Sequence, residues 1–396
     1  MDTERRLATI RTISDISPIP GADMIVKLTI DGWDLVSQKG SFKVGDRAVY
    51  FEIDSFLPVT PEFEFLRPRC FKSTVHVGDG FRLKTIKLRG QVSQGLALPL
   101  SDFPTIPSDA KEGDDVTDLL GVKKWEPAPE GNGSRFGPSG ARGNFPDFLR
   151  KSDQERIQNC FGSLSKAIMF REEVSFHAEE PLIENSEKQF SVQTADGWLI
   201  KTMIERSEEE RKSAGKYEVT LKLDGSSMTV YHNQGQIGVC SRNLDLKRIA
   251  GNVFWDTAIE SRIIAALALM GRNVATQGEL MGPGIQGNRE GLNRHVYYVY
   301  NVFDIDAQRY LTPVERQNFF EDLSNLDIIN PAAVTGVPWI EDVYFDQFES
   351  VSDFLEYADR PSIVHKVAEG VVFKPFDANG RSFKVISNKF LLAEKD

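Results

Sequence analysis

The stretch "VTLKLDGSSMTVY", residues 219–231, decides how the second half of this chain is interpreted. Apolar side chains alternate with polar ones on both sides of Asp224 and Gly225, which is the period-2 pattern of β-strands. The Asp-Gly pair predicts a turn between two strands, as in a hairpin. Lys222 stands beside that turn. It is either a solvated residue at a strand end or a nucleophile, because an ammonium loses its proton more readily than a guanidinium when partly buried or near other cations.

Composition sets the class of protein. The chain has 396 residues, of which 40% are hydrophobic and 27% charged, and this length favours about two globular domains. The cysteines are odd in number and far apart, which argues against a disulfide framework and a structural zinc site: Cys70, Cys160 and Cys240. The N-terminus carries no apolar signal segment, and no long apolar run follows. We therefore expect a protein of the cytoplasm, with the nucleus left open and no membrane partner. A monomer is the expected state, although no pattern in the sequence bears on it.

The charge balance is acidic. Lysine and arginine number 47 and aspartate and glutamate 58, which gives a net charge of −11. An acidic total does not indicate a protein that binds nucleic acid through its overall charge. Phosphate binding requires only a local basic face, so the position of the basic residues matters more than their sum.

The chain divides into three parts by pattern. Residues 1–121 contain short strand-like runs separated by turns at even spacing, which predicts a small β-barrel of the OB type. Residues 122–144 concentrate proline, glycine, serine and charge, and we expect an interdomain linker there. Residues 145–396 mix strands with helices.

Two helices are predicted in the second domain. The run at 246–273 has apolar residues at helical spacing and ends at Gly271, and the run at 312–326 begins with a capping signal of Thr312, Pro313 and Glu315. The segments between and after them alternate as strands do. The expected fold class is α+β, with an OB-like barrel followed by a domain built on a largely antiparallel sheet.

A series of short motifs follows Lys222 along the chain. They are, in order, Ser-Arg-Asn at 241–243, Glu279 in "QGEL", the aromatic run "YYVYNVFDID" at 297–306, Glu-Gly-Val-Val at 369–372, and Lys-Val-Ile at 384–386. Taken singly, each is an ordinary strand end, turn or core residue. Together and in this order, they resemble the covalent nucleotidyltransferase superfamily of ATP-dependent ligases and capping enzymes.

The resemblance implies roles for these residues. Lys222 would attack the α-phosphorus of ATP and become lysyl-AMP, for which the pKa of its ammonium has to fall. Mg²⁺ or Mn²⁺ would bind Glu369, with Asp224 in support, and hard oxygen ligands suit such cations. The remaining positions implied for the nucleotide are Glu279 and Arg242 at the ribose and a phosphate, Phe303 stacked on adenine, Lys384 with Lys374 or Lys389 on the transferring phosphate, and Leu221 and Gly225 beside the nucleophile.

Further features narrow the resemblance. The segment "FPDFLRKSDQERIQN", residues 145–159, is similar to the leading segment of RNA ligases, and the OB-like module precedes the catalytic domain. This order resembles the Naegleria-type and Deinococcus-type RNA ligases. The resemblance implies an ATP-dependent RNA ligase that seals 3′-OH and 5′-phosphate ends in RNA repair, through lysyl-AMP and an adenylylated 5′ end.

Two positions depart from the pattern. Thr220 stands where many ligases carry a glutamate that reads the adenine amino group. We therefore expect base selection to rest on the main chain or on other side chains. Asp396 ends the sequence soon after Lys384, so we expect something other than a C-terminal OB domain to orient the pyrophosphate, such as a second metal or the N-terminal module.

RNA binding is expected on the OB-like module. The run "RLKTIKLRG" brings together four basic residues, Arg82, Lys84, Lys87 and Arg89, on what is either a nucleic-acid-binding groove or a solvated barrel face. The nearby Tyr50, Phe51 and Phe81 are either base-stacking or core residues. Other functions stay open at this point: a DNA ligase, a GTP-dependent capping enzyme, or a non-catalytic nucleic-acid-binding protein with an OB module. The five histidines form no pair at metal-ligand spacing.

Overall fold

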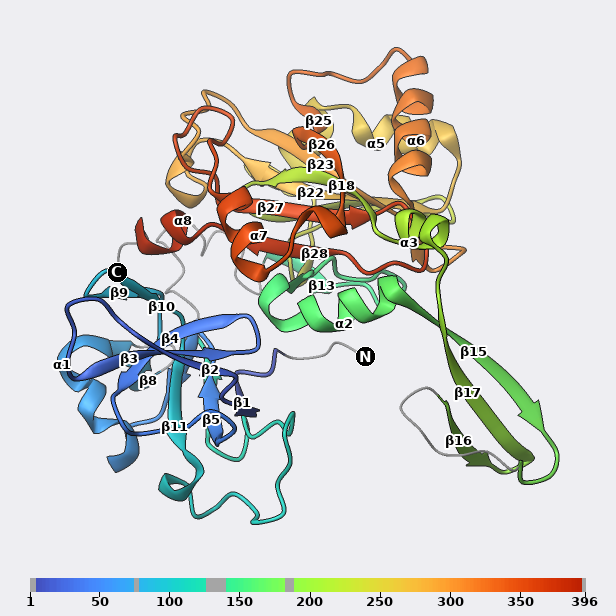
Figure 1. The fold of residues 1–396 in the computed structure, drawn as a ribbon. Helices are drawn as coiled ribbons and strands as arrows, with labels where there is room; N and C mark the ends of the chain where they lie inside the picture. The colour runs from blue at the N-terminus through green and yellow to red at the C-terminus, as the bar shows by residue number, and fades with distance from the viewer. Residues whose placement is uncertain (1–4, 75–77, 126–139, 182–188, 394–396) are drawn as a thin grey trace. The chain divides into compact units, whose positions relative to one another are not determined.

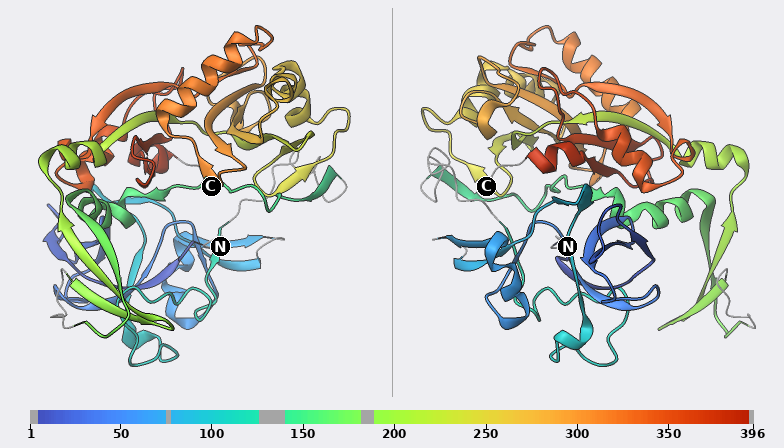
Figure 2. Two further views of the ribbon diagram at one scale, coloured as in Figure 1. Left: turned by 90° about the vertical axis from the view of Figure 1, so that its right-hand side faces the viewer. Right: turned by 60° about the vertical axis from the view of Figure 1, so that its left-hand side comes forward.

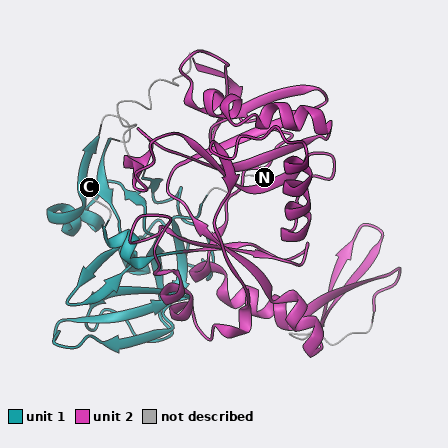
Figure 3. Cartoon of the chain, turned by 90° about the horizontal axis from the view of Figure 1, so that it is seen from above, with its two compact units in different colours: residues 1–137, 386–396 teal, residues 138–385 magenta. Residues whose placement is uncertain are grey.

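The computed structural model describes residues 5–74, 78–125, 140–181 and 189–393. The chain forms two compact units, residues 1–137 with 386–396 and residues 138–385 (Figure 3). The division expected from the sequence assigned residues 386–396 to the second domain, whereas here they belong to the first unit. Of the expected linker, residues 126–139 lie outside the described part of the chain.

The first unit is built from short antiparallel strands in small sheets (Figure 1). The sheet orders are β1-β5-β11, β2-β3-β4, β9-β10 and β12-β6-β8-β7. The elements are β1 (Ala8–Thr12), β2 (Asp15–Pro18), β3 (Ile25–Ile30), β4 (Trp33–Gln38), β5 (Arg47–Phe51), β6 (Ser55–Leu57), α1 (Arg67–Cys70), β7 (Phe71–Thr74), β8 (Gly78–Arg82), β9 (Ile86–Leu88), β10 (Gln91–Ser93), β11 (Leu96–Pro99) and β12 (Lys123–Lys124).

The C-terminal residues complete the core of this first unit. Ile386 and Leu391, the latter on α8 (Asn388–Ala393), are buried in one hydrophobic cluster with Trp33 and Tyr50. Trp33 is fully buried, and burying a side chain of this size contributes much of the stability of a small module. Residues far apart in the sequence therefore share one core.

The second unit contains two main sheets (Figures 1 and 2). The larger has the order β13-β21-β20-β19-β22-β23-β24 with β25 beside β23, and the smaller has the order β14-β28-β27-β18-β26. Their strands are β13 (Ala141–Asn144), β14 (Glu155–Arg156), β18 (Lys216–Lys222), β19 (Ser226–Asn233), β20 (Gln236–Cys240), β21 (Leu244–Leu246), β22 (Val274–Met281), β23 (Val296–Asp304), β24 (Arg309–Tyr310), β25 (Val334–Gly336), β26 (Trp339–Tyr344), β27 (Gly370–Pro375) and β28 (Phe383–Ile386).

The stretch at 219–231 is not a hairpin. β18 pairs with β26 and β27 in the smaller sheet, while β19 pairs with β20 and β22 in the larger one. Asp224 and Gly225 therefore form the crossover between the two sheets. The local pattern predicted both strands correctly but the hairpin was wrong, because alternation says nothing about which strand is the pairing partner. Lys222 is the last residue of β18, where the chain leaves the smaller sheet.

The smaller sheet has an apolar face and a polar face. Its apolar face packs against α2 (Ile157–Met169) and α7 (Val351–Ala358) through side chains such as Val219, Phe373 and Phe383. Because side chains alternate along a strand, the residues between these point to the opposite face. Thr220, Lys222, Lys374 and Lys384 are among them, and they line the pocket described below.

One helix matches its prediction and the other does not. α6 (Pro313–Asn325) begins with the expected capping box of Thr312 and Glu315. The single helix expected at 246–271 is instead β21 followed by α4 (Val253–Glu260) and α5 (Ile263–Met270). Arg262 between them has a φ of 59°, a left-handed conformation that interrupts helical hydrogen bonding. Apolar spacing alone did not reveal this break.

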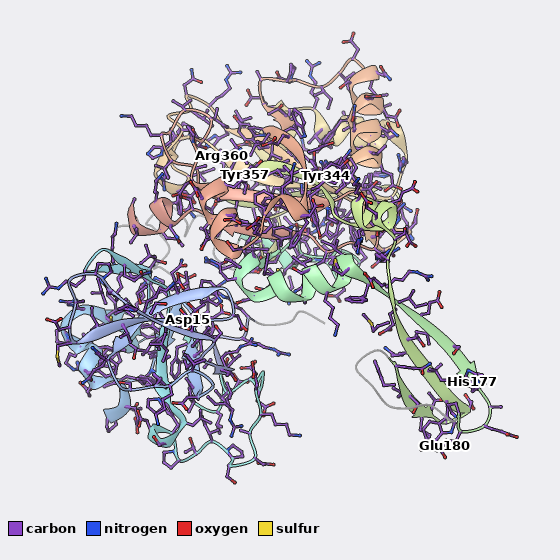
Figure 4. All side chains as sticks on the ribbon, in the orientation of Figure 1. Asp15, His177, Glu180, Tyr344, Tyr357 and Arg360 are labelled. Atoms are coloured by element: carbon purple, nitrogen blue, oxygen red, sulfur yellow. The ribbon has the colours of Figure 1, made fainter. Side chains whose placement is uncertain are left out.

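A three-stranded sheet projects from the second unit (Figure 2). It consists of β15 (Phe170–His177), β16 (Gln189–Thr194) and β17 (Gly197–Glu205), and α3 (Glu208–Ala214) follows it. His177 and Glu180 are labelled at its far end in Figure 4. None of its described residues lines the pocket. Within the described part of the chain, no helix is long and apolar enough to cross a membrane.

Candidate active site

A pocket of about 550 Å³ is lined by residues of both main sheets of the second unit. Strand ends from the two sheets meet here because the chain crosses between them after Lys222. The pocket brings together most of the residues that the sequence predicted for the site: Leu221, Lys222, Asp224, Gly225, Arg242, Glu279, Glu369, Lys374 and Lys384. Phe303 and Lys389 are not among its lining residues.

Lys222 forms an ion pair with Glu369. The Nζ of Lys222 lies 2.6 Å from Oε1 of Glu369, which precedes β27. Burial alone would lower the pKa of Lys222, but the carboxylates of Glu369, Glu279 and Asp224 outweigh it and raise that pKa. Without a bound cation, the pocket therefore holds this lysine as an ammonium, whereas attack on phosphorus requires the neutral amine.

Glu279 on β22 is a half-buried carboxyl that approaches the crossover. The backbone N–H of Gly225 donates to Oε1 of Glu279 at 3.1 Å. Desolvation by the surrounding protein raises the pKa of Glu279 to about 8, even though Lys222 acts in the opposite direction. A Cβ on residue 225 would lie 2.6 Å from the carbonyl oxygen of Leu280 and 2.9 Å from Cγ of Glu279, so the approach requires glycine.

Asp224 has a partner that the sequence did not indicate. Nη1 of Arg289 lies 3.9 Å from Oδ2 of Asp224, and Nη2 of Arg289 lies 3.4 Å from Nδ1 of His365. Arg289 follows a short 3₁₀ turn at Gln286–Asn288 and carries no motif of its own. Only the fold brings it close to the crossover.

The carboxylates suit a hard cation held partly by other ligands. Glu369 and Asp224 both line the pocket, and oxygen ligands are those that Mg²⁺ and Mn²⁺ prefer. Among the described residues, no group of three or more His, Cys, Asp or Glu side chains is arranged to hold a metal ion. The donor set therefore fits a cation that keeps waters or phosphate oxygens in its coordination shell, as Mg²⁺ usually does.

The basic side of the pocket converges on Asp153. Nζ of Lys384 lies 2.9 Å from Oδ1 of Asp153, and Nη2 of Arg242 lies 3.1 Å from its Oδ2. Desolvation lowers the pKa of Lys384 to about 8, with Arg156 and Lys222 acting in the same direction and Asp153 opposing them. Asp153 belongs to the quoted segment 145–159, but no pattern in the sequence assigned it a role.

Tyr300, not Phe303, is the pocket aromatic of β23. Phe303 is fully buried in a core cluster with Tyr231 and Ile305, and its ring centroid lies 5.1 Å from that of Tyr310. The pairing of β23 with β22 shifts register at Tyr300, so simple alternation does not relate the two side chains, and the full burial of Phe303 leaves its ring no free face for a base. The expected stacking of Phe303 on a base is therefore not supported, and Tyr300 lines the pocket in its place.

The other two predicted lysines differ in position. Lys374 is buried on β27 and donates to the backbone carbonyl of Tyr300. Burial, with a contribution from Arg316, holds the pKa of Lys374 well below its usual value. Lys389 lies on α8, in the first unit, and is not a lining residue of the pocket.

The predicted basic face of the first unit is only partly exposed. Arg82 is buried, with its guanidinium 5.0 Å from the centroid of the Trp125 ring, so the expectation of a surface residue was wrong for Arg82. Lys84 is half-buried, and Lys87 and Arg89 are exposed. The sequence left open whether three nearby aromatic residues stack on bases or pack in the core. All three are buried in the core: Tyr50, Phe51 and Phe81.

Comparisons with known proteins agree with this geometry. An OB-fold domain model matches residues 7–100, and an RNA ligase model matches residues 215–386. A mutant of the Naegleria gruberi RNA ligase solved with ATP and Mn is 38% identical, with a TM-score of 0.81, and the match covers 99% of this chain and 100% of that chain. No curated protein matches the chain.

Two further structures of the Naegleria gruberi RNA ligase are similar. A mutant with AMP and Mn has a TM-score of 0.80 at 38% identity, covering 99% of this chain and 100% of that one. The structure with PPi has a TM-score of 0.78 at 39% identity, covering 98% of each chain. The expected fold class, an OB module followed by a ligase nucleotidyltransferase domain, is confirmed. The chain belongs to the RNA ligase family.

Proposed function

We propose that this protein joins RNA 3′-OH and 5′-phosphate ends by three nucleotidyl transfers, with Lys222 as the carrier of AMP. The observation that supports it most directly is the 2.6 Å ion pair of Lys222 with Glu369, in a pocket that Asp224 and Glu279 also line. ATP is the proposed nucleotide, and the similarity to a ligase solved with ATP and with AMP supports that choice.

In the first transfer, the neutral Nζ of Lys222 attacks the α-phosphorus of ATP. A P–N bond forms, the bond from the α-phosphorus to the bridging oxygen breaks, and pyrophosphate leaves. Glu369, with Asp224 in support, would hold Mg²⁺ or Mn²⁺, whose positive charge would offset the carboxylates and favour the neutral amine. Glu279 orients the crossover through its hydrogen bond from Gly225.

The same residues serve the two later transfers. The 5′-phosphate of RNA attacks the phosphorus of lysyl-AMP, which releases Lys222 and gives an adenylylated end; the 3′-OH then attacks that end and AMP leaves. Lys384 and Arg242 bind the reacting phosphates, and Tyr300 stacks on the adenine. One pocket suffices because all three steps are in-line displacements at phosphorus that need the same positive charge.

The rest of the proposal concerns the setting of the reaction. The OB-type barrel of residues 1–121, followed by a linker at 122–144, contributes Lys84, Lys87 and Arg89 to RNA binding. Nicked or broken RNA is the substrate, and the protein acts as a monomer in the cytoplasm. Binding through this basic run would weaken with increasing salt, and replacing one phosphate-binding lysine by alanine should reduce the slope of that dependence by about one.

The test is covalent labelling with α-³²P-ATP, in parallel with α-³²P-GTP, in the presence of Mg²⁺ or Mn²⁺. We expect a labelled band from ATP with the wild type and with Lys216→Ala, and none with Lys222→Ala. Lys216 is a matched control because it lies on the same strand, pairs with Asp342 and does not line the pocket. Labelling from GTP alone, or labelling that survives in Lys222→Ala, would contradict the proposal.

A further inference from the structure

The backbone of the segment that carries Asp153 is anchored at the pocket by hydrogen bonds. The backbone carbonyl of Arg150 accepts hydrogen bonds from the Gln277 side chain at 2.7 Å and the Tyr310 hydroxyl at 2.8 Å. Asn301 donates to the hydroxyl of Ser152 at 2.8 Å. These anchors belong to strands of the larger sheet, so the residues just before Asp153 are fixed to it.

The residues just after Asp153 are fixed to the smaller sheet. β14 pairs with β28 in parallel, and this register sets Arg156 opposite Lys384. Asp153 therefore lies between two anchored positions, one on each sheet. A carboxylate held in this way has a defined location at the pocket, unlike a side chain on an independent surface loop.

Asp153 contacts two cations from different sheets. Lys384 comes from β28 of the smaller sheet, and Arg242 lies between β20 and β21 of the larger one. Each carboxylate oxygen of Asp153 contacts one of these cations. Oδ1 lies 2.9 Å from Nζ of Lys384, and Oδ2 lies 3.1 Å from Nη2 of Arg242. Two cations that converge on the two oxygens of one anion form a site that a phosphate group can also occupy.

The exposure of the three side chains differs. Lys384 is only 20% exposed, whereas the side chains of Asp153 and Arg242 are 58% and 57% exposed. The less exposed lysine is thus the fixed partner, while the carboxylate can turn into solvent without leaving a fully buried charge behind. Ion pairs at such exposure are weak, so a more highly charged anion can replace the carboxylate.

We propose that Asp153 is an exchangeable counter-ion, which holds Lys384 and Arg242 before the nucleotide binds and is displaced by the phosphates of the nucleotide. This inference rests on the proposed function. A carboxylate and a phosphate repel each other and compete for the same N–H donors, so Asp153 weakens the binding of each phosphate species. It also keeps the two cations in place between the three transfers. Asp153 is a positioning residue that acts through Lys384 and Arg242.

The same exchange assists the release of products. Pyrophosphate leaves after the first transfer and AMP after the third, and each departure exposes the two cations. Asp153 returns to them and lowers the free energy of the vacated pocket. We therefore expect Asp153 to weaken the binding of ATP and pyrophosphate together, whereas a residue that merely orients Lys384 for the reaction would strengthen both.

The test compares wild type, Asp153→Asn and Asp147→Asn in lysyl-AMP formation at varied ATP and pyrophosphate. Asp147 is an exposed aspartate of the same segment that does not line the pocket. We expect Asp153→Asn to lower the KM for ATP and the inhibition constant for pyrophosphate about fivefold each, and to leave kcat within about twofold. The control should match the wild type. An unchanged or higher KM in Asp153→Asn would overturn the inference.

Binding without chemistry separates this inference from the proposed function. Calorimetry with ATP and with inorganic tripolyphosphate on Lys222→Ala and on Lys222→Ala/Asp153→Asn should give tighter binding in the double variant. If the wild type fails to form lysyl-AMP, the proposed function falls, while the calorimetry still decides the role of Asp153. If Asp153→Asn does not fold, Asp153→Ser in the same assay decides it, and equal or weaker binding would refute the exchange.

Discussion

The two sides of the pocket shift the pKa of a lysine in opposite directions. At the end of β18, Lys222 is surrounded by Glu369, Glu279 and Asp224, and its pKa is raised. On β28, Lys384 lies near Arg156 with Asp153 as its counter-ion, and its pKa falls to about 8. Both lysines are half-buried, so burial does not explain the difference. The number of carboxylates around each amine decides whether the pocket holds it firmly as an ammonium or leaves it near its titration point.

The largest expected effect comes from removing the main carboxylate partner of Lys222. Glu369→Gln should lower the rate of lysyl-AMP formation by about 100-fold or more, because it removes a charged ligand of the proposed cation. The same change should lower the pKa of Lys222. If Glu369 did nothing except retain the proton on that lysine, the rate would rise instead. Single-turnover labelling with α-³²P-ATP shows whether the rate of lysyl-AMP formation in Glu369→Gln falls or rises.

Glu349→Gln is the control for that experiment. Glu349 is exposed, and its side chain does not line the pocket. We expect wild-type labelling from it. A Glu369→Gln protein that labels as fast as this control would mean that the carboxylate side of the pocket has no part in the first transfer.

An intermediate effect should appear in the pH dependence of the Lys384 side. With a pKa of about 8, Lys384 is an ammonium below that pH and a neutral amine above it. The pH profile of kcat/KM for ATP should therefore have a falling limb, with a decrease of about tenfold between pH 7 and 9. This parameter reports ionisations of the free enzyme. Lys384→Arg stays charged throughout and should lose the limb, whatever its absolute rate. A limb that persists in Lys384→Arg would assign it to another group.

The smallest expected effect concerns stability. The pKa of Glu279 is about 8 in the folded protein against an ordinary value of 4.5, so the folded state binds an additional proton between these values. Its contribution to stability is therefore fully present at low pH and is lost as the pH rises through 8. Glu279→Gln has no such titration. The Tm of the variant relative to wild type should increase by roughly 4 °C from pH 6 to pH 9, as measured by thermal unfolding.

A constant difference in Tm across that range would mean that Glu279 titrates in its ordinary range. Thr335→Val, with the side chain exposed on β25, serves as a pH-independent reference. Comparing two proteins at each pH cancels the titrations that they share. The result would then show whether the carboxylate side of the pocket contains a proton as well as an ion pair.

The sequence predicted the chemistry of the pocket better than its geometry. Lys222, Glu279, Glu369 and Lys384 line one pocket, as the resemblance to the nucleotidyltransferase superfamily implied from the residue types and their order along the chain. Pairing partners are not constrained in this way, so the hairpin at 219–231 was wrong. Phe303 was misassigned for a similar reason, since an aromatic run does not say which of its rings faces the pocket.

Two residues were given no role from the sequence, although one of them, Asp153, lies in the segment at 145–159 that resembles RNA ligases. Asp153 and Arg289 acquire their positions from strand pairing and from the crossover, which a single sequence does not contain. On the first unit, the basic run at 82–89 predicted a continuous face, but burial removed Arg82 from it. A run of charges specifies composition, and only packing against Trp125 determines which of the charges reach solvent.

The core shared by Trp33, Tyr50, Ile386 and Leu391 bears on how the protein is made. A ribosome delivers the chain from the N-terminus, and domains generally fold as they emerge. The first unit cannot follow that order, because the last pieces of its core are synthesised after the whole second unit. The core around Trp33 and Tyr50 therefore stays incomplete until Leu391 has been synthesised, although it belongs to the part of the chain that leaves the ribosome first.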